Sequence, residues 1–354
     1  MGRPFFTVVI TTYNREQIIR RAVDSCLGQA FEDFEVVVVD DASTDGTVTA
    51  IESYEDPRVR VVAHEQNRGI NPARHTGAAA AQGEWVVVVD SDWELLPDAL
   101  ERLHAAIEAL PDGVRVVRFR MRWDDGLVTP RFVPSEPYGY EGRIRWVEEE
   151  GGNDAGRCIA AAVFEGTPYY ADRRGALESL FELDLAKAET TLCLDEVLGL
   201  EHSDAPNSWL RSTSAGELLP RLRKEAPDML WMAETTLSRH GEALRRWGPK
   251  QHANMQRVAA VQAFLLGRRR LGLRHALASL RSKPFAPLTW VTLVLGLVGP
   301  GALARGNLAQ RRLQSWAPSR LVSSVRRQSA PAAPAAAGSS PAGPRRAGTG
   351  SPPR

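Results

Sequence analysis

The sequence predicts an α/β fold, with a doubly wound and mostly parallel sheet, helices on both of its faces, and a helical C-terminal region. Short runs rich in β-branched residues alternate with stretches of helical periodicity four times within residues 5–110, which is typical of doubly wound sheets. These runs lack polar alternation, as expected for strands buried on both faces of a parallel sheet. A mostly helical, arginine-rich segment runs from Ser214 to Gln262.

Four strands and three helices are predicted in the first part of the chain. The strands are FFTVVIT (Phe5 to Thr11), EVVVVD (Glu35 to Asp40), VRVVA (Val59 to Ala63) and EWVVVVD (Glu84 to Asp90). The helices between them are Gln17 to Leu27, Asp45 to Tyr54 after a Ser/Thr-rich cap, and the alanine-rich Asn71 to Ala81. In such a sheet, ligands bind beyond the carboxyl ends of the strands.

The middle of the chain has weaker patterns. We expect, in order, a helix, a strand, a Gly/Pro-interrupted region with little periodicity, and another helix: Pro97 to Leu110, Val114 to Met121, Trp123 to Gly152, and Arg174 to Ala188. The last of these has a stripe of leucine and phenylalanine at helical spacing.

An apolar segment from Phe285 to Ala304 contains two prolines and several glycines. A membrane-spanning helix needs about 20 apolar residues, whereas the unbroken apolar part of this segment has only about 12. The segment therefore predicts an interfacial or buried helical hairpin rather than a span. From about Gln328 the chain is rich in Pro, Ala, Gly and Ser, which predicts a disordered tail.

Composition limits the class of protein and its partners. The chain has 354 residues, 43% of them hydrophobic and 25% charged, which is typical of globular proteins. Its 3 cysteines are far apart, and its first residues lack a signal-peptide pattern, so we expect a reducing, cytoplasmic location. All 43 acidic residues precede residue 243, and 19 of the 44 basic ones follow it. This asymmetry predicts an anionic surface as partner for residues 243–327, on the inner face of the plasma membrane; no nucleic-acid motif is present.

Polar clusters follow three of the predicted strands. They are Thr11-Thr12-Tyr13-Asn14, Asp40-Asp41-Ala42-Ser43-Thr44-Asp45, and Asp90-Ser91-Asp92. One such cluster alone is often a helix cap or a solvated loop. Because the carboxyl ends of parallel strands meet at the same edge of a sheet, the three together predict one cleft.

The DSD stretch has a chemical interpretation. Two nearby carboxylates repel each other, and burial raises the pKa of at least one of them unless a cation neutralises the pair. Mg²⁺ or Mn²⁺ is commonly held by one or two carboxylates and completes its coordination with water and phosphate oxygens. Asp90 and Asp92 therefore predict a divalent metal that assists departure of a diphosphate.

Three stretches together resemble the nucleotide-sugar-binding half of family 2 glycosyltransferases, which have the GT-A fold. They are PFFTVVITTYNRE, FEDFEVVVVDDASTDGT and NRGINPARHTGAAAAQGEWVVVVDSDWELLPDAL. The resemblance covers about Pro4 to Leu110, in order and spacing, and is more specific than any single short motif.

The resemblance implies roles for the strand-end residues. Tyr13 would stack on the nucleobase, Asp41 would bind it, with uracil as the base, and Asp92 would ligate the metal. The structural alternatives are a turn residue for Tyr13, a helix cap for Asp41 and a surface ion pair for Arg74. The nucleotide-sugar residues implied are Thr11, Tyr13, Asn14, Asp41, Arg74, Asp90 and Ser91.

Family members invert the anomeric centre, and a carboxylate removes the proton of the acceptor hydroxyl. In the family this base commonly lies in a Glu-Asp pair that opens a helix, and here the pair reads Glu178-Ser179. Glu178 is the first candidate and Glu182, one turn later, the second. Asp184 is a third candidate or a buried partner, and a solvated helix face is the alternative for all three. His202, in a stretch that resembles a donor-closing loop, is a further metal or diphosphate ligand, or a structural histidine.

The sequence thus predicts a glycosyltransferase of cell-envelope polysaccharide synthesis that moves a sugar from a nucleotide sugar to a glycan or lipid-linked acceptor. The predicted parts are a nucleotide-sugar-binding half, an acceptor-side half of the same domain, a basic helical region, and a tail: residues 1–112, 113–213, 214–327 and 328–354. One alternative is a catalytically impaired nucleotide-sugar-binding module, because the expected aspartate after Glu178 is missing. A DxD phosphohydrolase is the other, although its motif usually lies near the N-terminus.

Overall fold

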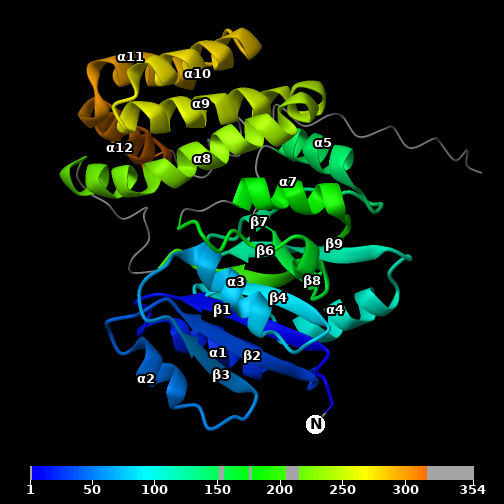
Figure 1. Ribbon diagram of the computed structural model, residues 1–354. Helices are drawn as coiled ribbons and strands as arrows, with labels where there is room; N and C mark the ends of the chain where they lie inside the picture. The colour runs from blue at the N-terminus through cyan, green and yellow to red at the C-terminus, as the bar shows by residue number, and fades with distance from the viewer. Residues whose placement is uncertain (1, 151–154, 175–177, 205–214, 317–354) are drawn as a thin grey trace, which may run out of the picture. The chain divides into compact units, whose positions relative to one another are not determined.

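Figure 1 shows the protein as a computed structural model, which describes residues 2–150, 155–174, 178–204 and 215–316. A single sheet has the strand order β3-β2-β1-β4-β8-β6-β9-β5, and β7 pairs with β6. The strands are β1 (Phe6–Thr12), β2 (Phe34–Asp40), β3 (Val59–Ala63), β4 (Trp85–Asp90), β5 (Trp93–Leu95), β6 (Val114–Trp123), β7 (Val128–Thr129), β8 (Gly156–Ala160) and β9 (Thr190–Glu201).

Helices connect these strands, and the chain after β9 is helical without further strands in the described residues. Those that alternate with strands are α1 (Ile19–Leu27), α2 (Thr47–Glu52), α3 (Ile70–Ala80), α4 (Ala99–Glu108), α5 (Tyr140–Glu150), α6 (Val163–Gly166) and α7 (Glu178–Ala188). Those that follow β9 are α8 (Ala215–Trp247), α9 (Pro249–Leu265), α10 (Arg269–Ser282), α11 (Pro287–Val298) and α12 (Pro300–Trp316). The predicted α/β class and the helical C-terminal region are confirmed.

The sheet is parallel where the sequence predicts it. β1 pairs in parallel with β2 and β4, and β2 with β3. β8 is antiparallel to both of its neighbours, β4 and β6, so the complete sheet is mixed. The register pairs Thr11 with Asp90 and Thr12 with Asp40. The polar ends of β1, β2 and β4 therefore lie side by side.

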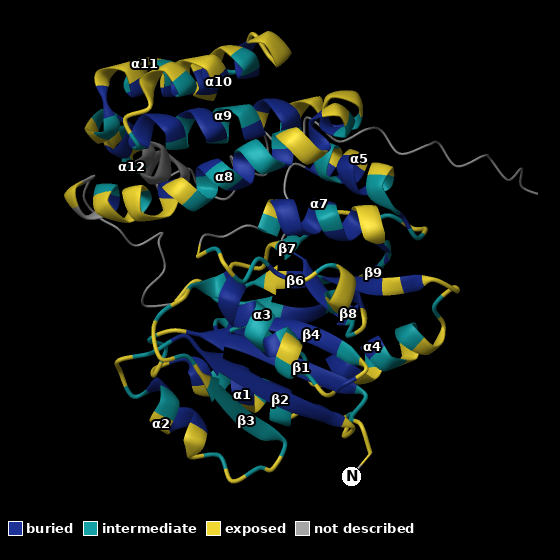
Figure 2. Ribbon diagram, viewed as in Figure 1, coloured by how far each residue is buried: buried dark blue, intermediate teal, exposed yellow. Residues whose placement is uncertain are grey.

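The unbroken valines of β4 are explained by helices on both faces of the sheet. Val87 and Val89 share a core cluster with Ile19 of α1 and Leu103 of α4. Val86 and Val88, which point to the other face, cluster with Ala73 of α3, and the partly buried Phe164 packs against this cluster. Figure 2 shows the central strands as buried. The strand that carries Asp90 at its end is thus held rigidly from both sides.

Close packing fixes α3 against the sheet. A Cβ atom at Gly77 would lie 2.2 Å from a methyl group of Val9 in β1, so only glycine lets the helix approach this near. Gly69, just before α3, has a φ of 101°, which favours glycine. These two residues determine the position of Arg74, which lies between them on α3.

Several predicted features differ from the structure. β3 is only half-buried, because it lies at the edge of the sheet. Trp123 to Gly152, for which no regular structure is predicted, contains β7 and α5. The helix expected from Arg174 begins at Glu178 within the described residues, and β8 and β9 are not predicted. β8 reads GRCIA and, unlike the equally short β3, lacks the run of β-branched residues that indicates a strand.

The described residues as far as Leu308 form one compact unit. The predicted hairpin is present as α11 and α12, which are separated at Gly299 (φ 141°). Gly306 of α12 lies against the Leu295 side chain of α11. Across the described residues, no helix combines the length and the apolar character that a membrane span requires. The tail predicted from Gln328 lies outside the described residues.

Candidate active site

The loops after β1 and β2 are joined by hydrogen bonds. The Asn14 N–H donates to Ser43 Oγ at 2.8 Å, and the Thr44 N–H donates to Asn14 Oδ1 at 2.7 Å. Ser43 Oγ in turn donates to Asp40 Oδ1 at 2.5 Å. Asn14 has a positive φ of 52°, a conformation that asparagine tolerates better than most residues. Two of the three predicted clusters therefore form one polar rim.

Asp41 is buried and organises the start of α3. Its carboxylate accepts the N–H groups of Arg68 and Gly69 at 2.8 and 2.7 Å, and lies 2.8 Å from His64 Nδ1. The sequence suggests a cap on the next helix along the chain, α2, whereas the contacts are at the start of α3. An ionised carboxylate has about four acceptor positions, so these contacts leave Asp41 able to accept another donor. Tyr13, in the loop after β1, is 40% exposed.

The third cluster ends β4. Ser91 is buried and Asp92 is half-buried. Burial, reinforced by the neighbouring Asp90 carboxylate, raises the pKa of Asp92 to about 6. Arg15 and Arg21 act in the opposite direction without cancelling this effect. A nearby cation would therefore stabilise the ionised form of Asp92.

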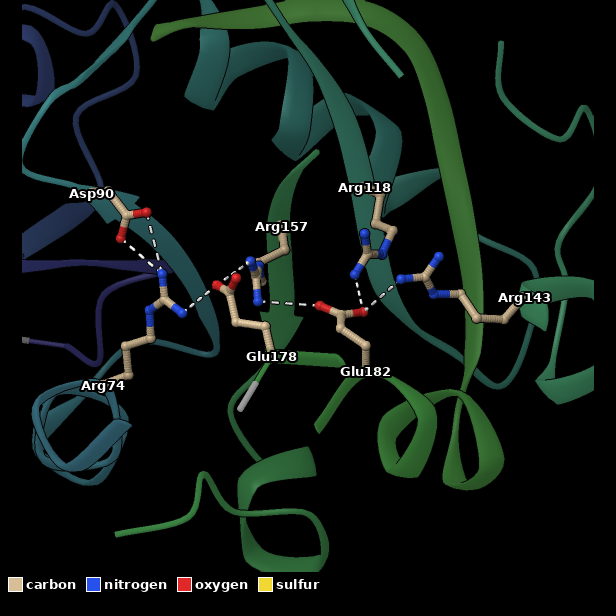
Figure 3. Close-up of polar contacts among 7 residues, drawn as sticks. All are labelled: Arg74, Asp90, Arg118, Arg143, Arg157, Glu178 and Glu182. Carbon is tan, nitrogen blue, oxygen red and sulfur yellow. Dashed lines mark hydrogen bonds and ion pairs between the residues drawn. The ribbon is translucent and has the colours of Figure 1, made fainter. Parts of the chain in front are cut away.

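Arg74 joins the end of β4 to α7. Its side chain is only 2% exposed. Nη2 donates to both oxygens of Asp90, at 2.9 and 3.2 Å, and Nη1 donates to Glu178 Oε1 (Figure 3). The structure therefore brings together Arg74, Asp90 and Glu178, which are far apart in the sequence. Arg74 forms a buried ion pair rather than the surface pair considered from the sequence.

Alternating charges continue from Glu178 into the interior (Figure 3). Arg157 of β8 lies 3.2 Å from Glu178 Oε1 and 3.1 Å from Glu182 Oε1. Glu182 Oε2 also accepts from Arg118 of β6 and lies 3.6 Å from Arg143 of α5. We call this series, Asp90-Arg74-Glu178-Arg157-Glu182-Arg118/Arg143, the ion-pair chain.

Exposure separates the two glutamates of α7. The Glu178 side chain is 43% exposed, whereas that of Glu182 is 9% exposed. Arg74, followed by Arg157, lowers the pKa of Glu178 to about 2 against the opposing effect of burial. Burial alone would raise the pKa of Glu182, but Arg118, Arg157 and Arg143 together lower it. Both are ionised at neutral pH, and Glu178 is the more accessible to a substrate.

Asp184 lies on the side of α7 that faces α8. His240 Nε2 lies 2.9 Å from its Oδ1, Arg239 donates to Oδ2 at 3.1 Å, and Tyr170 also donates to Oδ2. Tyr140 Oη lies 2.6 Å from His240 Nδ1. These contacts are those of the buried-partner alternative, and they attach α7 to the long helix α8.

His202 follows β9 and lies beside the DSD cluster. The backbone N–H of His202 donates to the backbone carbonyl of Asp92 at 3.0 Å, while its ring Nε2 lies 2.7 Å from Glu94 Oε1. Glu94, in β5, also lies 3.4 Å from Arg21. The described part of the chain contains no group of three His, Cys, Asp or Glu side chains that could hold a metal by themselves. The rest of the stretch that the sequence predicts to close over the donor falls in residues 205–214, which lie outside the described residues.

The partners of Glu182 are not identified from the sequence. Arg118 is one of four arginines in β6 and is the buried one, so it needs a buried acid, but the sequence does not distinguish it from the other three. Glu182, among the apolar residues of α7, is the matching signal. Their pairing joins strands and helices far apart in the chain, and such contacts leave no local pattern.

Replacing Glu182 by glutamine should lower the free energy of unfolding by about 3 kcal/mol at pH 7, because it leaves buried guanidinium groups without their counter-charge. The folded-state pKa of Glu182 is depressed, so its stabilisation exists above the unfolded pKa, about 4.3, and is lost as pH falls. Urea unfolding at pH 7 and pH 3 should show the difference shrinking at low pH. The exposed i,i+4 pair Glu141–Arg145 supplies a control, since Glu141→Gln should cost under about 0.5 kcal/mol. Equal effects of the two substitutions would contradict the buried role of Glu182.

Comparisons with known proteins agree with this arrangement. The sequence profile described as Glycosyl transferase family 2 matches residues 7–161. The succinoglycan biosynthesis protein ExoO of Rhizobium meliloti is 45% identical over 100 residues, which are 28% of this chain and 29% of that protein. The putative teichuronic acid biosynthesis glycosyltransferase TuaG of Bacillus subtilis is 38% identical over 102 residues, 28% of this chain and 40% of that protein. The matches thus span well under half of these relatives.

The fold has a similar solved structure. The crystal structure of S. aureus TarS 1-349 superposes with a TM-score of 0.50 and 20% sequence identity, over 79% of this chain and 91% of that one. The superposition covers more of the chain than the profile match over residues 7–161 does.

Proposed function

Since the chain belongs to glycosyl transferase family 2 through residues 7–161, we propose that it transfers a sugar from a nucleotide-sugar donor to a hydroxyl group of a glycan or lipid-linked acceptor. Attack by that hydroxyl on the anomeric carbon in a single displacement would invert the configuration. The observation that carries the proposal is Arg74, which binds Asp90 and Glu178 at once. One site thereby contains the polar strand ends and an accessible carboxylate.

The donor would lie along the ends of β1, β2 and β4. Tyr13 is exposed enough to stack on a base, and Asp41 retains acceptor capacity for an imide N–H, which favours uracil. Asn14 holds the rim between β1 and β2 in shape, and the buried Thr11 and Ser91 support its floor. Asp90, fixed by Arg74, faces the ribose or sugar side.

The residues at the end of β4 fit a divalent cation. Asp92 has a pKa raised to about 6 by burial and by Asp90, so it gains from a positive charge nearby. Mg²⁺ and Mn²⁺ need only one or two protein carboxylates when phosphate oxygens complete the coordination. Asp92 would hold the ion, and His202, whose backbone N–H binds the Asp92 carbonyl, would be a further ligand of the ion or of the diphosphate. When bound, the ion neutralises charge that develops on the leaving diphosphate.

Glu178 is the proposed general base. It is ionised at neutral pH, and its side chain is accessible. A base with a pKa of about 2 is weak, and catalysis favours a pKa near the working pH. The negative charge of a bound donor would raise that pKa, because a nearby like charge disfavours the ionised form. The site would then gain base strength when the donor is in place.

The acceptor and the location are proposed from separate observations. Two relatives are named for succinoglycan and teichuronic acid biosynthesis, which supports a glycan acceptor in cell-envelope polysaccharide synthesis. Cys26, Cys158 and Cys193 are buried free thiols, which supports a reducing, cytoplasmic compartment.

The direct test is release of nucleoside diphosphate from a panel of nucleotide sugars with Mn²⁺, in the presence of candidate glycan acceptors. We expect release from at least one donor, and we expect that donor to be a UDP-sugar. Donor binding without any release, across the panel, would instead establish the alternative of a catalytically impaired binding module. Phosphate release from simple phosphomonoesters would favour the phosphohydrolase alternative, which family membership already disfavours.

A further inference from the structure

Helix α11 has its polar residues inside and its apolar residues outside. Thr289, Thr292 and Gly296 face the protein and are buried. The exposed side is made of large apolar side chains, which are between 45% and 70% exposed: Leu288, Trp290, Val291, Val294, Leu297 and Val298. A helix on the surface of a soluble protein normally has the opposite arrangement.

Specific contacts fix this orientation. Thr289 Oγ1 lies 3.1 Å from Ser279 Oγ of α10, while Thr292 Oγ1 is satisfied within α11 itself by donating to the Leu288 carbonyl at 2.8 Å. A Cβ atom at Gly296 would lie 2.2 Å from the ring of Phe264, so α11 can pack on α9 only through this face. The apolar side is therefore presented outward by the packing of the helix bundle.

The exposed apolar surface continues onto α10 and the segment after it. Leu273 and Leu277 are 37% and 41% exposed, and Phe285 is 92% exposed. Exposed basic residues lie among them: Arg268, Arg269, Arg270, Arg274, Arg281 and Lys283. Figure 2 shows exposed residues along α10 and α11. We call these nine apolar and six basic residues the apolar-basic face.

Charge identifies the partner. No acidic residue occurs after Glu242, so every charged side chain of α9 to α12 is basic. A surface of this size that is apolar and basic together matches the boundary between anionic lipid headgroups and acyl chains. α11 has 12 residues, or about 18 Å of helix, against a bilayer core of about 30 Å. The helix can lie in the headgroup region, but it is too short to cross the bilayer core.

We propose that the apolar-basic face binds the surface of an anionic membrane, with the side chains of α11 in the acyl boundary and the arginines at lipid phosphates. This site is separate from the proposed active site and requires no donor. It would keep the enzyme next to a lipid-linked acceptor.

The test is flotation of the full chain, without donor, on two kinds of vesicle. One contains phosphatidylcholine alone, and in the other about 30% of the lipid is the anionic phosphatidylglycerol. The protein should float with the anionic vesicles and much less with the neutral ones. Val291→Glu/Val294→Glu, both at exposed positions, should reduce the bound fraction at least about tenfold, since a charge at the interface opposes insertion. Leu127→Glu, at a residue 40% exposed in the turn before β7, is the matched control and should bind like the wild type.

A second measurement does not depend on the folding of the glutamate variant. Lipids brominated on their acyl chains should quench the fluorescence of the wild type more than that of Trp290→Phe, while both bind equally. Equal flotation of Val291→Glu/Val294→Glu and wild type, or equal quenching of wild type and Trp290→Phe, would overturn the proposal. So would absence of flotation together with a dimer that the double variant disperses, because the partner would then be a second copy. Sugar transfer is not measured in any of these assays, so their failure leaves the proposed function untouched.

Discussion

Replacing Glu178 by glutamine should reduce sugar transfer about 10²–10⁴-fold, the usual contribution of a general base, with donor affinity nearly unchanged. Glutamine has similar size and can still contact Arg74 and Arg157, but it cannot accept the proton of the acceptor hydroxyl. The side chain is 43% exposed, so the fold should tolerate the change better than Glu182→Gln. Initial rates of nucleoside diphosphate release, with donor titrations, separate the effect on kcat from that on KM.

Glu165→Gln is the matched control for this substitution. Glu165 is exposed on α6, and its replacement should leave the rate within about twofold, as for most surface changes away from a site. A Glu178→Gln enzyme with wild-type kcat would remove Glu178 as the base. A large loss of donor affinity at unchanged kcat would assign it to donor binding instead.

Asp92→Asn should reduce transfer about 10²–10³-fold, the cost of removing one electrostatic component that stabilises a transition state. Asparagine keeps the shape of the side chain but loses the charge that would hold a divalent cation. Added Mn²⁺ should therefore raise the rate of the wild type and have little effect on the variant. The measurement is the rate of diphosphate release across a Mn²⁺ titration.

Asp98→Asn is the control for Asp92→Asn. It is the same chemical change, six residues further along, at a side chain that is 53% exposed and paired with Arg102. Its rate and its Mn²⁺ dependence should match those of the wild type. If Asp92→Asn kept full Mn²⁺-dependent transfer, the proposed metal site at the end of β4 would be wrong.

The sheet and the strand-end residues could be predicted because their signals are local. The valines of β2 and β4 indicate strands buried on both faces, and the direction of parallel strands then places Asp41, Asp90 and Asp92 at one edge. The expected family resemblance is confirmed by the match over residues 7–161.

The ion-pair chain could not be predicted, because its pairs join distant segments. Arg157 lies on the short β8, which has no clear pattern, and it connects Glu178 with Glu182. The three carboxylates of α7 look alike in sequence, and only their surroundings distinguish them. Glu178 is accessible, Glu182 is enclosed by arginines, and Asp184 is bound to α8.

The inverted amphipathicity of α11 also depends on packing. The sequence shows an apolar segment with small and hydroxyl residues, without indicating which side faces the protein. Phe264 of α9 decides this, because its ring packs directly against Gly296, where any side chain would clash. The resulting outward apolar face distinguishes an interfacial hairpin from a buried one.

The central claim is that the ends of β1, β2 and β4 bind a nucleotide sugar with the help of a cation at Asp92. Thermal unfolding with a panel of nucleotide sugars, with and without Mn²⁺, tests it most directly, because a ligand at 100 times its Kd adds about 2.7 kcal/mol to the stability. We predict that at least one nucleotide sugar raises the Tm of the wild type in Mn²⁺, and that EDTA or Asp92→Asn removes most of the shift. No shift with any nucleotide sugar, or an equal shift for the wild type and Asp92→Asn, would contradict the claim.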